Sequence, residues 1–329
     1  MPRQHVGFPN VFGMTPTEIA RFRADLDALA PSGRIAAAIS GGPDSLALLL
    51  LLHAVRPGFV LAATVDHRLR PEAADEAAMV AKLCGGLGVS HVTLAVTVAD
   101  HPDGPQASAR KARYAALGNW AESAGAAYIA TAHHADDQAE TLLMRLARGA
   151  GLPGLAGVRR SRPLDGQADV ILIRPLLDWR KAALEAICQS AGLEPARDPS
   201  NHDTRYDRTR ARALLQGGWP DAVRAAASAH HLAEAEEALA WMAATLADSR
   251  IILGRDNVKI DATDLPRALR RRLLLIGMER LNPAASPRGD AVERLLDSLE
   301  GGAVTTLAGL RCDPGPPWRF TIAPARRAH

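Results

Sequence analysis

Short apolar runs alternate with segments of helical spacing over residues 34–191, and this alternation limits the fold more than any other feature. Four stretches have the pattern of short buried strands: residues 34–39, 60–65, 91–98 and 127–131. Four others place apolar residues at helical spacing: residues 45–55, 71–86, 107–124 and 136–148. A strand near 170–173 and a helix at 179–191 continue the series. The pattern predicts an α/β fold, with a Rossmann-like parallel sheet and helices on both of its faces.

The texture of the chain changes at GGWP, residues 217–220. A charged, Ala-rich helix is expected at 221–248, followed by short strands, an Arg-rich helix at 267–281 and a Pro-rich end. A chain of 329 residues exceeds the usual size of one domain. We therefore predict two domains, the first over 1–217 and a smaller, mostly helical one over 218–329.

Composition narrows the class of protein. Apolar residues make up 47% of the chain, and no run approaches the roughly 20 apolar residues of a membrane helix. The first residues lack the apolar stretch of a signal peptide, so a cytoplasmic protein without membrane contact is expected. Cys84, Cys188 and Cys312 lie far apart, which argues against a disulfide framework, a zinc knuckle and a CxxC redox pair.

The stretch AAAISGGPDSLALLL, residues 36–50, joins the first expected strand to the first helix. An open α/β sheet binds phosphate at such a turn, because backbone N–H groups point outward and the helix N-terminus is partly positive. Gly41 and Gly42 let the backbone approach an anion, and Ser40 and Ser45 can donate hydroxyl hydrogen bonds. The pattern is neither a Walker A loop nor GxGxxG. The alternative is an ordinary tight turn capped by Asp44 or Ser45.

Polar residues also follow the second and fourth strands. Asp66 and His67 end the second strand, and TAHHADDQAET, residues 131–141, begins where the fourth strand ends. The second group comprises His133, His134, Asp136, Asp137 and Glu140. The spacing is not HExxH, and carboxylates beside a nucleotide suit Mg²⁺ better than zinc. The alternatives are a capped turn after the second strand and carboxylates that only favour a helix N-terminus.

Arginine dominates the basic residues, since only four of the 39 are lysine. Its planar fork of donors matches phosphate, although genome composition explains the bias equally well. Arg110 and Arg113 flank the start of the third helix. Arg205, Arg208 and Arg212 have helical spacing on one face, and a dense basic segment is formed by Arg267, Arg270, Arg271 and Arg272. Such faces suit phosphates, here of ATP or RNA, and the alternative is a solvated charged face.

SGGPDS, residues 40–45, matches the SGGxDS loop of the N-type ATP pyrophosphatases, the PP-loop family. Further segments resemble the tRNA(Ile)-lysidine synthetases within that family: VDHRLR, SARKARYAAL, TAHHADDQAETLLMRLARGAGLPGLAG, IRPLL and DPSNHDTRYDRTRAR. The resemblance covers about residues 34–212, and the segments occur in the expected order. Where these enzymes often have asparagine, this chain has Thr209.

The resemblance implies an ATP-binding catalytic first domain and a tRNA-binding second domain. ATP would adenylate the oxygen on carbon 2 of the wobble cytidine in the CAU anticodon of tRNA(Ile), and the ε-amine of free L-lysine would displace AMP. The lysidine formed would change the codon read from AUG to AUA. ATP and Mg²⁺ are the implied cofactors, and a homodimer is left open.

The resemblance also assigns residues to roles. The nucleotide would be bound by the loop and the end of the second strand: Ser40, Gly41, Gly42, Pro43, Asp44, Ser45, Asp66 and His67. The catalytic candidates are Asp44, His133, Asp136 and Asp137, of which the last two would hold Mg²⁺ or the substrate amine. Lysine must react as the neutral amine, and His133 is the first candidate for its base, with His134 as the alternative.

Two other functions are compatible with the glycine loop. A tRNA-thiolating pyrophosphatase shares it but needs closely spaced cysteines, which this chain lacks. A non-catalytic nucleotide-binding module would have little need for HHADDQAET or for a basic second domain.

Overall fold

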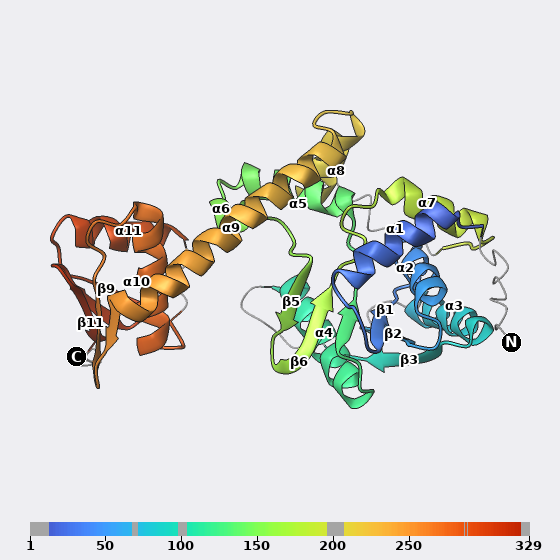
Figure 1. Cartoon of the computed structure of the whole chain (residues 1–329), viewed down its shortest axis with the longest axis horizontal. Coiled ribbons are helices and arrows are strands. Elements are labelled where there is room, and N and C mark those ends of the chain that lie inside the picture. The colour runs from blue at the N-terminus through green and yellow to red at the C-terminus, as the bar shows by residue number, and fades with distance from the viewer. Residues whose placement is uncertain are drawn as a thin grey trace, which may run out of the picture. The chain divides into compact units, whose positions relative to one another are not determined.

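The computed structural model describes residues 13–67, 72–97, 104–195, 207–285, 287 and 289–323. The chain divides into two compact units, residues 1–233 and 234–329 (Figure 1). The division falls inside the long helix α9 (Ala222–Arg250), whereas the GGWP motif had indicated a boundary before this helix.

A six-stranded sheet forms the centre of the first unit. Its strands are β1 (Ile35–Ala38), β2 (Val60–Asp66), β3 (Ser90–Ala95), β4 (Tyr128–Ala130), β5 (Ser161–Leu164) and β6 (Gln167–Ile173). Their order is β3-β2-β1-β4-β6-β5, and only the edge strand β5 is antiparallel to its neighbour. In the central strand, Ile35 pairs in register with Val60 of β2 and Tyr128 of β4. The predicted parallel sheet is confirmed.

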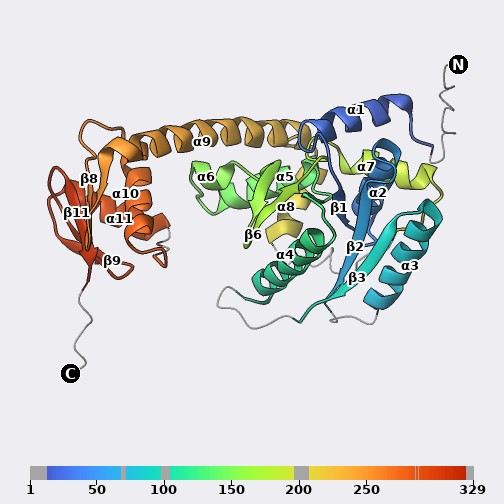
Figure 2. The same ribbon diagram turned by 60° about the horizontal axis from the view of Figure 1, so that its bottom comes forward.

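Helices cover both faces of this sheet (Figure 2). The helices of the first unit are α1 (Pro16–Asp27), α2 (Pro43–Val55), α3 (Glu72–Leu87), α4 (Pro105–Ser123), α5 (Ala135–Ala147), α6 (Leu152–Leu155), α7 (Lys181–Ser190) and α8 (Asp207–Gln216). Residues of α1, α2, α3 and α7 share one core, in which Leu46–Leu52 of α2 are completely buried. The other face packs against α4 through Tyr114, Leu117 and Ala121. The apolar run of α2 therefore reflects burial on all sides of the helix.

Helices α5 and α8 pack together at the carboxyl edge of the sheet. A small core joins Ala139 of α5 to Ala222 and Ala225 at the start of α9, with Leu142 and Leu215 beside it. This packing brings arginines of α8, which lie about 70 residues further along the chain, next to the acidic first half of α5.

The second unit has its own sheet and core. Its strands are β7 (Ile251–Leu253), β8 (Asn257–Ile260), β9 (Thr305–Leu307), β10 (Leu310–Asp313) and β11 (Trp318–Ile322), in the antiparallel order β7-β8-β11-β10-β9. Helices α10 (Arg267–Leu281) and α11 (Gly289–Glu300) contribute Leu273, Leu274 and Leu296 to a core with Val258 and Phe320. The sequence indicated short strands here but not that they form one sheet.

Among the residues that the structure describes, no helix is both long enough and apolar enough to cross a membrane.

Candidate functional site

The loop after β1 is held in shape by two serines. Ser45 lies in the first turn of α2 and is buried; its hydroxyl donates to the carbonyl oxygen of Gly42 at 2.9 Å. Oγ of Ser45 accepts in turn from the backbone N–H of Ser40 at 3.1 Å and from the hydroxyl of Ser40 at 3.2 Å. Ser45 therefore closes the loop around the helix N-terminus. The N–H groups of the first helical turn have no intrahelical acceptor and can receive an anion.

Gly41 is required by both conformation and space. Its φ angle of +87° lies in the left-handed region that other residues rarely adopt, and a Cβ would approach Cε of Met79 to 3.3 Å. Gly42 has ordinary extended angles and is the N-cap residue of α2, with Pro43 following at the first helical position. The sequence predicted a glycine turn at the start of this helix, but not which glycine takes the left-handed angle and which is the N-cap residue.

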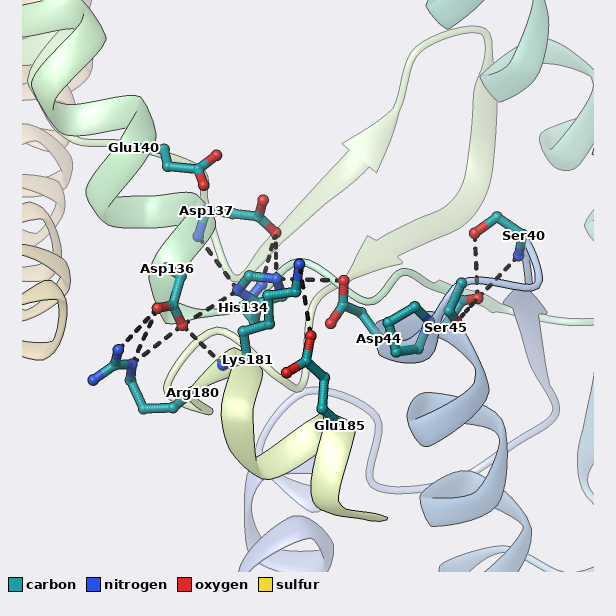
Figure 3. Close-up of polar contacts among 12 residues, drawn as sticks. Ser40, Asp44, Ser45, His134, Asp136, Asp137, Glu140, Arg180, Lys181 and Glu185 are labelled. Carbon is teal, nitrogen blue, oxygen red and sulfur yellow. Dashed lines mark hydrogen bonds and ion pairs between the residues drawn. The ribbon is translucent and has the colours of Figure 1, made fainter. Parts of the chain in front are cut away.

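Asp44, His134 and Asp137 converge in front of this loop (Figure 3). Nε2 of His134 lies 3.5 Å from Oδ2 of Asp44 and 3.6 Å from Oδ2 of Asp137. The other oxygen of Asp44, Oδ1, is buried and has no hydrogen-bond partner among the described residues. An orphaned carboxylate oxygen beside a phosphate loop is suited to a cation or a ligand donor.

His134 is the N-cap residue of α5 and is almost completely buried. Nδ1 of the His134 ring accepts from the backbone N–H of Asp137 at 3.4 Å. The backbone N–H of His134 donates to Oδ2 of Asp137 at 3.1 Å. Burial alone would lower the pKa of His134, but the contact with Asp44 and the charges of Asp137 and Asp136 outweigh it and raise the pKa. The ring is therefore part of the helix cap, which is a structural role that the sequence did not reveal.

Asp136 lies on the other side of the His134 ring, with its Oδ2 3.7 Å from Nδ1 of His134, and both of its oxygens have hydrogen-bond donors. Both of its oxygens accept from the guanidinium of Arg180, and Oδ2 also accepts from the N–H of Lys181 at 2.8 Å. Burial opposes it, but the hydrogen bonds from Arg180 and Lys181 lower the pKa of Asp136. Asp136 thus joins the start of α5 to the start of α7. This geometry favours a structural clamp over the predicted contact with Mg²⁺ or an amine.

Two more contacts connect α7 and the segment before it to the site. The N–H of Ala135 donates to the carbonyl oxygen of Trp179 at 2.9 Å. The thiol of Cys188 donates to the carbonyl oxygen of Pro43 at 3.2 Å. The phosphate loop, the cap of α5 and α7 therefore support one another.

His133 faces a different environment from its neighbour. Its Nδ1 lies 3.0 Å from the hydroxyl oxygen of Thr131. Burial, followed by the charges of Arg174, Arg110, Arg113 and Arg208, lowers the pKa of His133 to about 3. A group with so low a pKa is a weak proton acceptor at neutral pH. The environment of His133 therefore weakens the case for it as the base, which stays an untested prediction.

A cavity of about 550 Å³ joins these elements. It is lined by the loop, the ends of β2 and β4, and α3, α4, α5 and α8, with the polar lining residues Ser40, Asp44, Ser45, Thr64, His67, Glu76, Arg110, Arg113, Thr131, His133, Asp137 and Arg208. The volume is in the range of small-molecule sites. Asp66 lies at the end of β2 but does not line the cavity, whereas His67 does. Burial and then the charge of Arg113 lower the pKa of His67.

The predicted arginines fall into three situations. Arg110 and Arg113 line the cavity, and no carboxylate of the described residues lies within 4.0 Å of either. Arg208 lines it too and contacts Oε2 of buried Glu140 at 3.2 Å. Arg212 donates to Oε1 of Glu140 at 2.8 Å, so it holds α8 against α5. Arg205 lies outside the described residues.

The arginines of α10 are all neutralised within the second unit. Arg267 contacts Glu293, Asp297 and Glu300, and Arg270 contacts Glu300. Arg271 contacts Glu293. Arg272 and buried Glu236 form two hydrogen bonds, of 3.0 and 2.6 Å. Because α11 supplies most of the acids, this face is an ion-pair network and not a free phosphate site.

Mg²⁺ fits the cavity through two carboxylates. Mg²⁺ commonly binds one or two protein carboxylates together with substrate phosphates. Asp44 has a free oxygen and Asp137 lines the cavity, whereas both oxygens of Asp136 are occupied. Within the described ranges, no cluster of three or more His, Cys, Asp or Glu residues could hold a metal by itself. A Mg²⁺ ion here would depend on the phosphates of its nucleotide.

Sequence reasoning missed three residues that shape the site: Tyr114, Arg174 and Arg180. Tyr114 and Arg174 occur in the quoted segments SARKARYAAL and IRPLL, so their place in the chain was visible but their contacts were not. Arg174 is only 2% exposed and donates to the carbonyl oxygen of Arg159. Arg174 and Arg180 act through residues of other elements, and Tyr114 is contacted by Arg162 as well as by arginines of its own helix, which a linear pattern does not display.

None of the three cysteines lines the cavity, although Cys188 contacts the loop beneath it. Cys84 and Cys188 lie in the core of the first unit and Cys312 in that of the second. Burial raises the pKa of Cys84 and of Cys188 to about 11, and that of Cys312 to about 12. Buried thiols with such pKa values are poor nucleophiles, and this argues against sulfur transfer.

The parallel sheet and the glycine loop beneath the cavity define a nucleotide-binding protein of the PP-loop class. The family profile described as "PP-loop domain" matches residues 15–217. A solved structure, the U34-tRNA thiolase NcsA of Methanococcus maripaludis with its [4Fe-4S] cluster, has a similar fold. Its TM-score is 0.56 at 19% identity, and the match covers 66% of this chain and 78% of that one. At this identity the likeness concerns the fold alone.

Curated relatives are more similar in sequence. The tRNA(Ile)-lysidine synthase of Novosphingobium aromaticivorans is 49% identical over 317 residues, which are 94% of this chain and 95% of that protein. The tRNA(Ile)-lysidine synthase of Zymomonas mobilis is 43% identical over 298 residues, 90% of each chain. The chain belongs to the tRNA(Ile)-lysidine synthase family of PP-loop, ATP-using proteins.

Proposed function

We propose that this protein is a ligase that joins lysine to carbon 2 of the wobble cytidine in the CAU anticodon of tRNA(Ile), using ATP. The observation that carries the proposal is the sequence identity of 49% to a tRNA(Ile)-lysidine synthase over 94% of the chain. The cavity supports it, because the phosphate loop and the arginines of α4 and α8 line the same space.

The first step is adenylation of the tRNA. The oxygen on carbon 2 of the cytidine attacks the α-phosphorus of ATP, and the bond to the pyrophosphate oxygen breaks. The turn at Ser40–Ser45 and the start of α2 would bind the pyrophosphate, because hydrogen-bond donors placed at a leaving group stabilise its charge. Asp44 and Asp137 would hold Mg²⁺, which when bound offsets that charge further.

In the second step the ε-amine of lysine attacks carbon 2 and AMP leaves. A free lysine amine has a pKa of about 10.4, so only about one molecule in two thousand is neutral at pH 7. We infer that the cavity selects the neutral form, because Arg110, Arg113 and Arg208 line it and like charges disfavour an ammonium. The same arginines, together with burial and Arg174, lower the pKa of His133. The arginines that line the cavity would thus favour the neutral amine of lysine without a strong base.

For the second unit we propose contact with tRNA through the open face of its sheet. Helix α10 packs on the other face, and its arginines are paired. Lys259 of β8 and Arg319 of β11 are register neighbours, both exposed, and no carboxylate among the described residues lies within 4.0 Å of their charged groups. Exposed cations of this kind bind phosphate without reading bases.

The test is lysine transfer by the full-length protein. Radiolabelled lysine, ATP and Mg²⁺ are supplied with a transcript of tRNA(Ile) carrying CAU, and release of AMP and pyrophosphate is followed. We expect one lysine incorporated for each AMP released, only when ATP is present, and no incorporation into a tRNA(Met) that also carries CAU.

Asp44→Asn is the matched variant, because it keeps the size of the side chain but removes its charge. It should abolish pyrophosphate release. If the wild-type protein forms AMP but transfers lysine to no tRNA, the proposal is contradicted. Only the use of ATP would then remain established.

A further inference from the structure

The ring of Tyr114 in α4 is surrounded by three guanidinium groups. The Cζ atom of Arg110 lies 5.0 Å from the ring centroid, that of Arg113 5.2 Å and that of Arg162 5.6 Å. The tyrosine is 7% exposed and belongs to the core on this face of the sheet. Three cations around one buried ring need an attraction that offsets their mutual repulsion, and the negative face of an aromatic ring supplies it.

Two of these cations have no partner of opposite charge among the residues that the structure describes. Arg162 contacts Asp165 at 3.2 Å, but no carboxylate of the described residues lies within 4.0 Å of Arg110 or Arg113. Both line the cavity. Among the described residues, the contact with the Tyr114 ring therefore restricts the orientation of the Arg110 and Arg113 side chains.

The hydroxyl of Tyr114 is buried beside the guanidinium groups of Arg113 and Arg174. It has no partner at strict hydrogen-bond geometry among the described residues, although both guanidinium groups lie close enough to act on it. Burial would raise the pKa of Tyr114, but the charges of Arg113, Arg110 and Arg174 outweigh it and lower the pKa. The hydroxyl thus lies in the field of the arginines while the ring makes the contacts.

We propose that Tyr114 is a positioning residue: its ring holds Arg110 and Arg113 against the cavity, where they bind a phosphate of the substrate. The phosphate belongs either to ATP or to the RNA backbone at the target cytidine. The inference deepens the proposed function. It depends on that function only if the phosphate belongs to RNA.

The first test compares Tyr114→Leu with Tyr114→Phe in the full-length enzyme. Leucine fills the core but has no π face, so KM for the substrate that Arg110 and Arg113 contact should rise about tenfold, the factor for two lost cation–π contacts. The change in kcat should be smaller. Phenylalanine keeps the ring and loses only the hydroxyl beside Arg113 and Arg174, so its KM should rise clearly less than that of the leucine variant.

Tyr128→Leu is the matched control for general loosening. Tyr128 lies on β4 and packs against the core on the other face of the sheet. It should lower thermal stability as much as Tyr114→Leu does without raising either KM. If Tyr114→Leu does not fold, the Phe variant and the arginine variant below still decide the matter.

A double-mutant cycle identifies the residue through which Tyr114 acts. In an Arg113→Ala background, Tyr114→Leu should have a much smaller effect on KM than in wild type, because the contact is already lost. Tyr114→Phe combined with Arg113→Ala should equal Arg113→Ala alone.

ATP binding and tRNA binding are measured separately, which distinguishes the two sources of phosphate. A rise confined to KM for ATP assigns the arginines to the triphosphate. A rise in KM for tRNA, with the slope of log affinity against log salt reduced by about 0.7 for each lost phosphate contact, assigns them to RNA. Unchanged KM values in Tyr114→Leu, or full additivity with Arg113→Ala, would overturn the proposal. If wild type binds ATP but modifies no tRNA, the proposed function fails while the ATP arm still tests Tyr114.

Discussion

Two arginine-rich regions look alike in the sequence and differ in the structure. Arg110 and Arg113 line a cavity without a carboxylate partner in the described part of the chain. The arginines of α10 each contact at least one acid, from α11 or from α9. Arginine density is therefore a poor guide to phosphate binding. What matters is whether the fold supplies an acid, and that acid can lie 30 residues away in the chain.

The two arrangements differ in energy as well. Exposed ion pairs such as those of Arg267 contribute little to stability, because water and salt screen them. Cations held together in a cavity repel one another and are costly until an anion arrives. The repulsion between the cavity arginines is thus relieved when a phosphate binds. The paired arginines of α10 have no such repulsion to relieve.

The largest difference between the regions should be catalytic. Arg113→Ala should lower kcat/KM for lysine transfer by about 100-fold or more, because a donor that faces the substrate charge in the cavity is lost. Arg271→Ala, in α10, should change it less than about twofold. Steady-state assays on both variants test this, and equal losses would erase the distinction between the regions.

The next effect concerns stability, and here the larger loss is expected in the α10 region and not in the cavity. Glu236→Gln leaves the charge of Arg272 uncompensated in a mostly buried site, which should cost about 3 kcal/mol. The urea transition of the second unit should move to lower concentration while kcat/KM is kept. Arg113→Ala is the control and should leave that transition in place. A Glu236→Gln protein as stable as wild type would mean that this pair is as weakly coupled as the exposed ones.

A smaller effect measures the positive field of the cavity. The native pKa of His133, about 3, lies below the unfolded value of about 6.5. Below pH 6.5 the unfolded chain gains a proton that native His133 does not, so stability is lost as pH falls from 6.5 toward 3. His133→Gln removes this loss, and its melting temperature should fall about 2–4 °C less than that of wild type between pH 7 and pH 5.

The exposed His231 in α9 provides the control for that experiment. His231→Gln should follow the wild-type pH dependence. If His133→Gln also follows it, the cavity arginines do not act on His133 as the geometry indicates.

The smallest effect is expected for tRNA affinity on changing α10. The sequence alone predicts that losing three arginine contacts flattens the salt slope by roughly 2 units. Because these arginines are paired, Arg267→Ala, Arg270→Ala and Arg271→Ala together should change it by far less. Lys259→Ala with Arg319→Ala should flatten it by about 1.4 units. A flatter slope for the α10 variant and an unchanged one for the sheet variant would reverse our assignment of the two faces.

The parts of the molecule that the sequence predicted are those that depend on local patterns. The strand at 60–65 and the helix at 267–281 agree with β2 and α10 within one residue, because burial imposes its period on the chain. The loop at Ser40–Ser45 was visible because all its residues are contiguous. The sheet of the second unit was not, since its strands are short and pair across long connections.

The roles of individual site residues were harder to predict, because partners come from distant elements. Asp136 and Asp137 are adjacent and looked equivalent, yet Arg180 and Lys181 engage the first and leave the second facing the cavity. His133 and His134 are also adjacent, and one lies among arginines while the other lies among carboxylates. A helix N-terminus turns neighbouring residues in different directions, and only the packed fold shows which one each faces.

The mutual support of the phosphate loop, α5 and α7 has a genetic consequence. Cys188 contacts the carbonyl of Pro43, and the start of α7 is tied through Asp136 to the helix that carries Asp137. Changes in α7 should therefore appear in a mutant screen as altered ATP use, although no residue of α7 lines the cavity. Second-site suppressors of a weakened Ser45 allele should accumulate around Cys188 and Arg180, far from the loop in the gene.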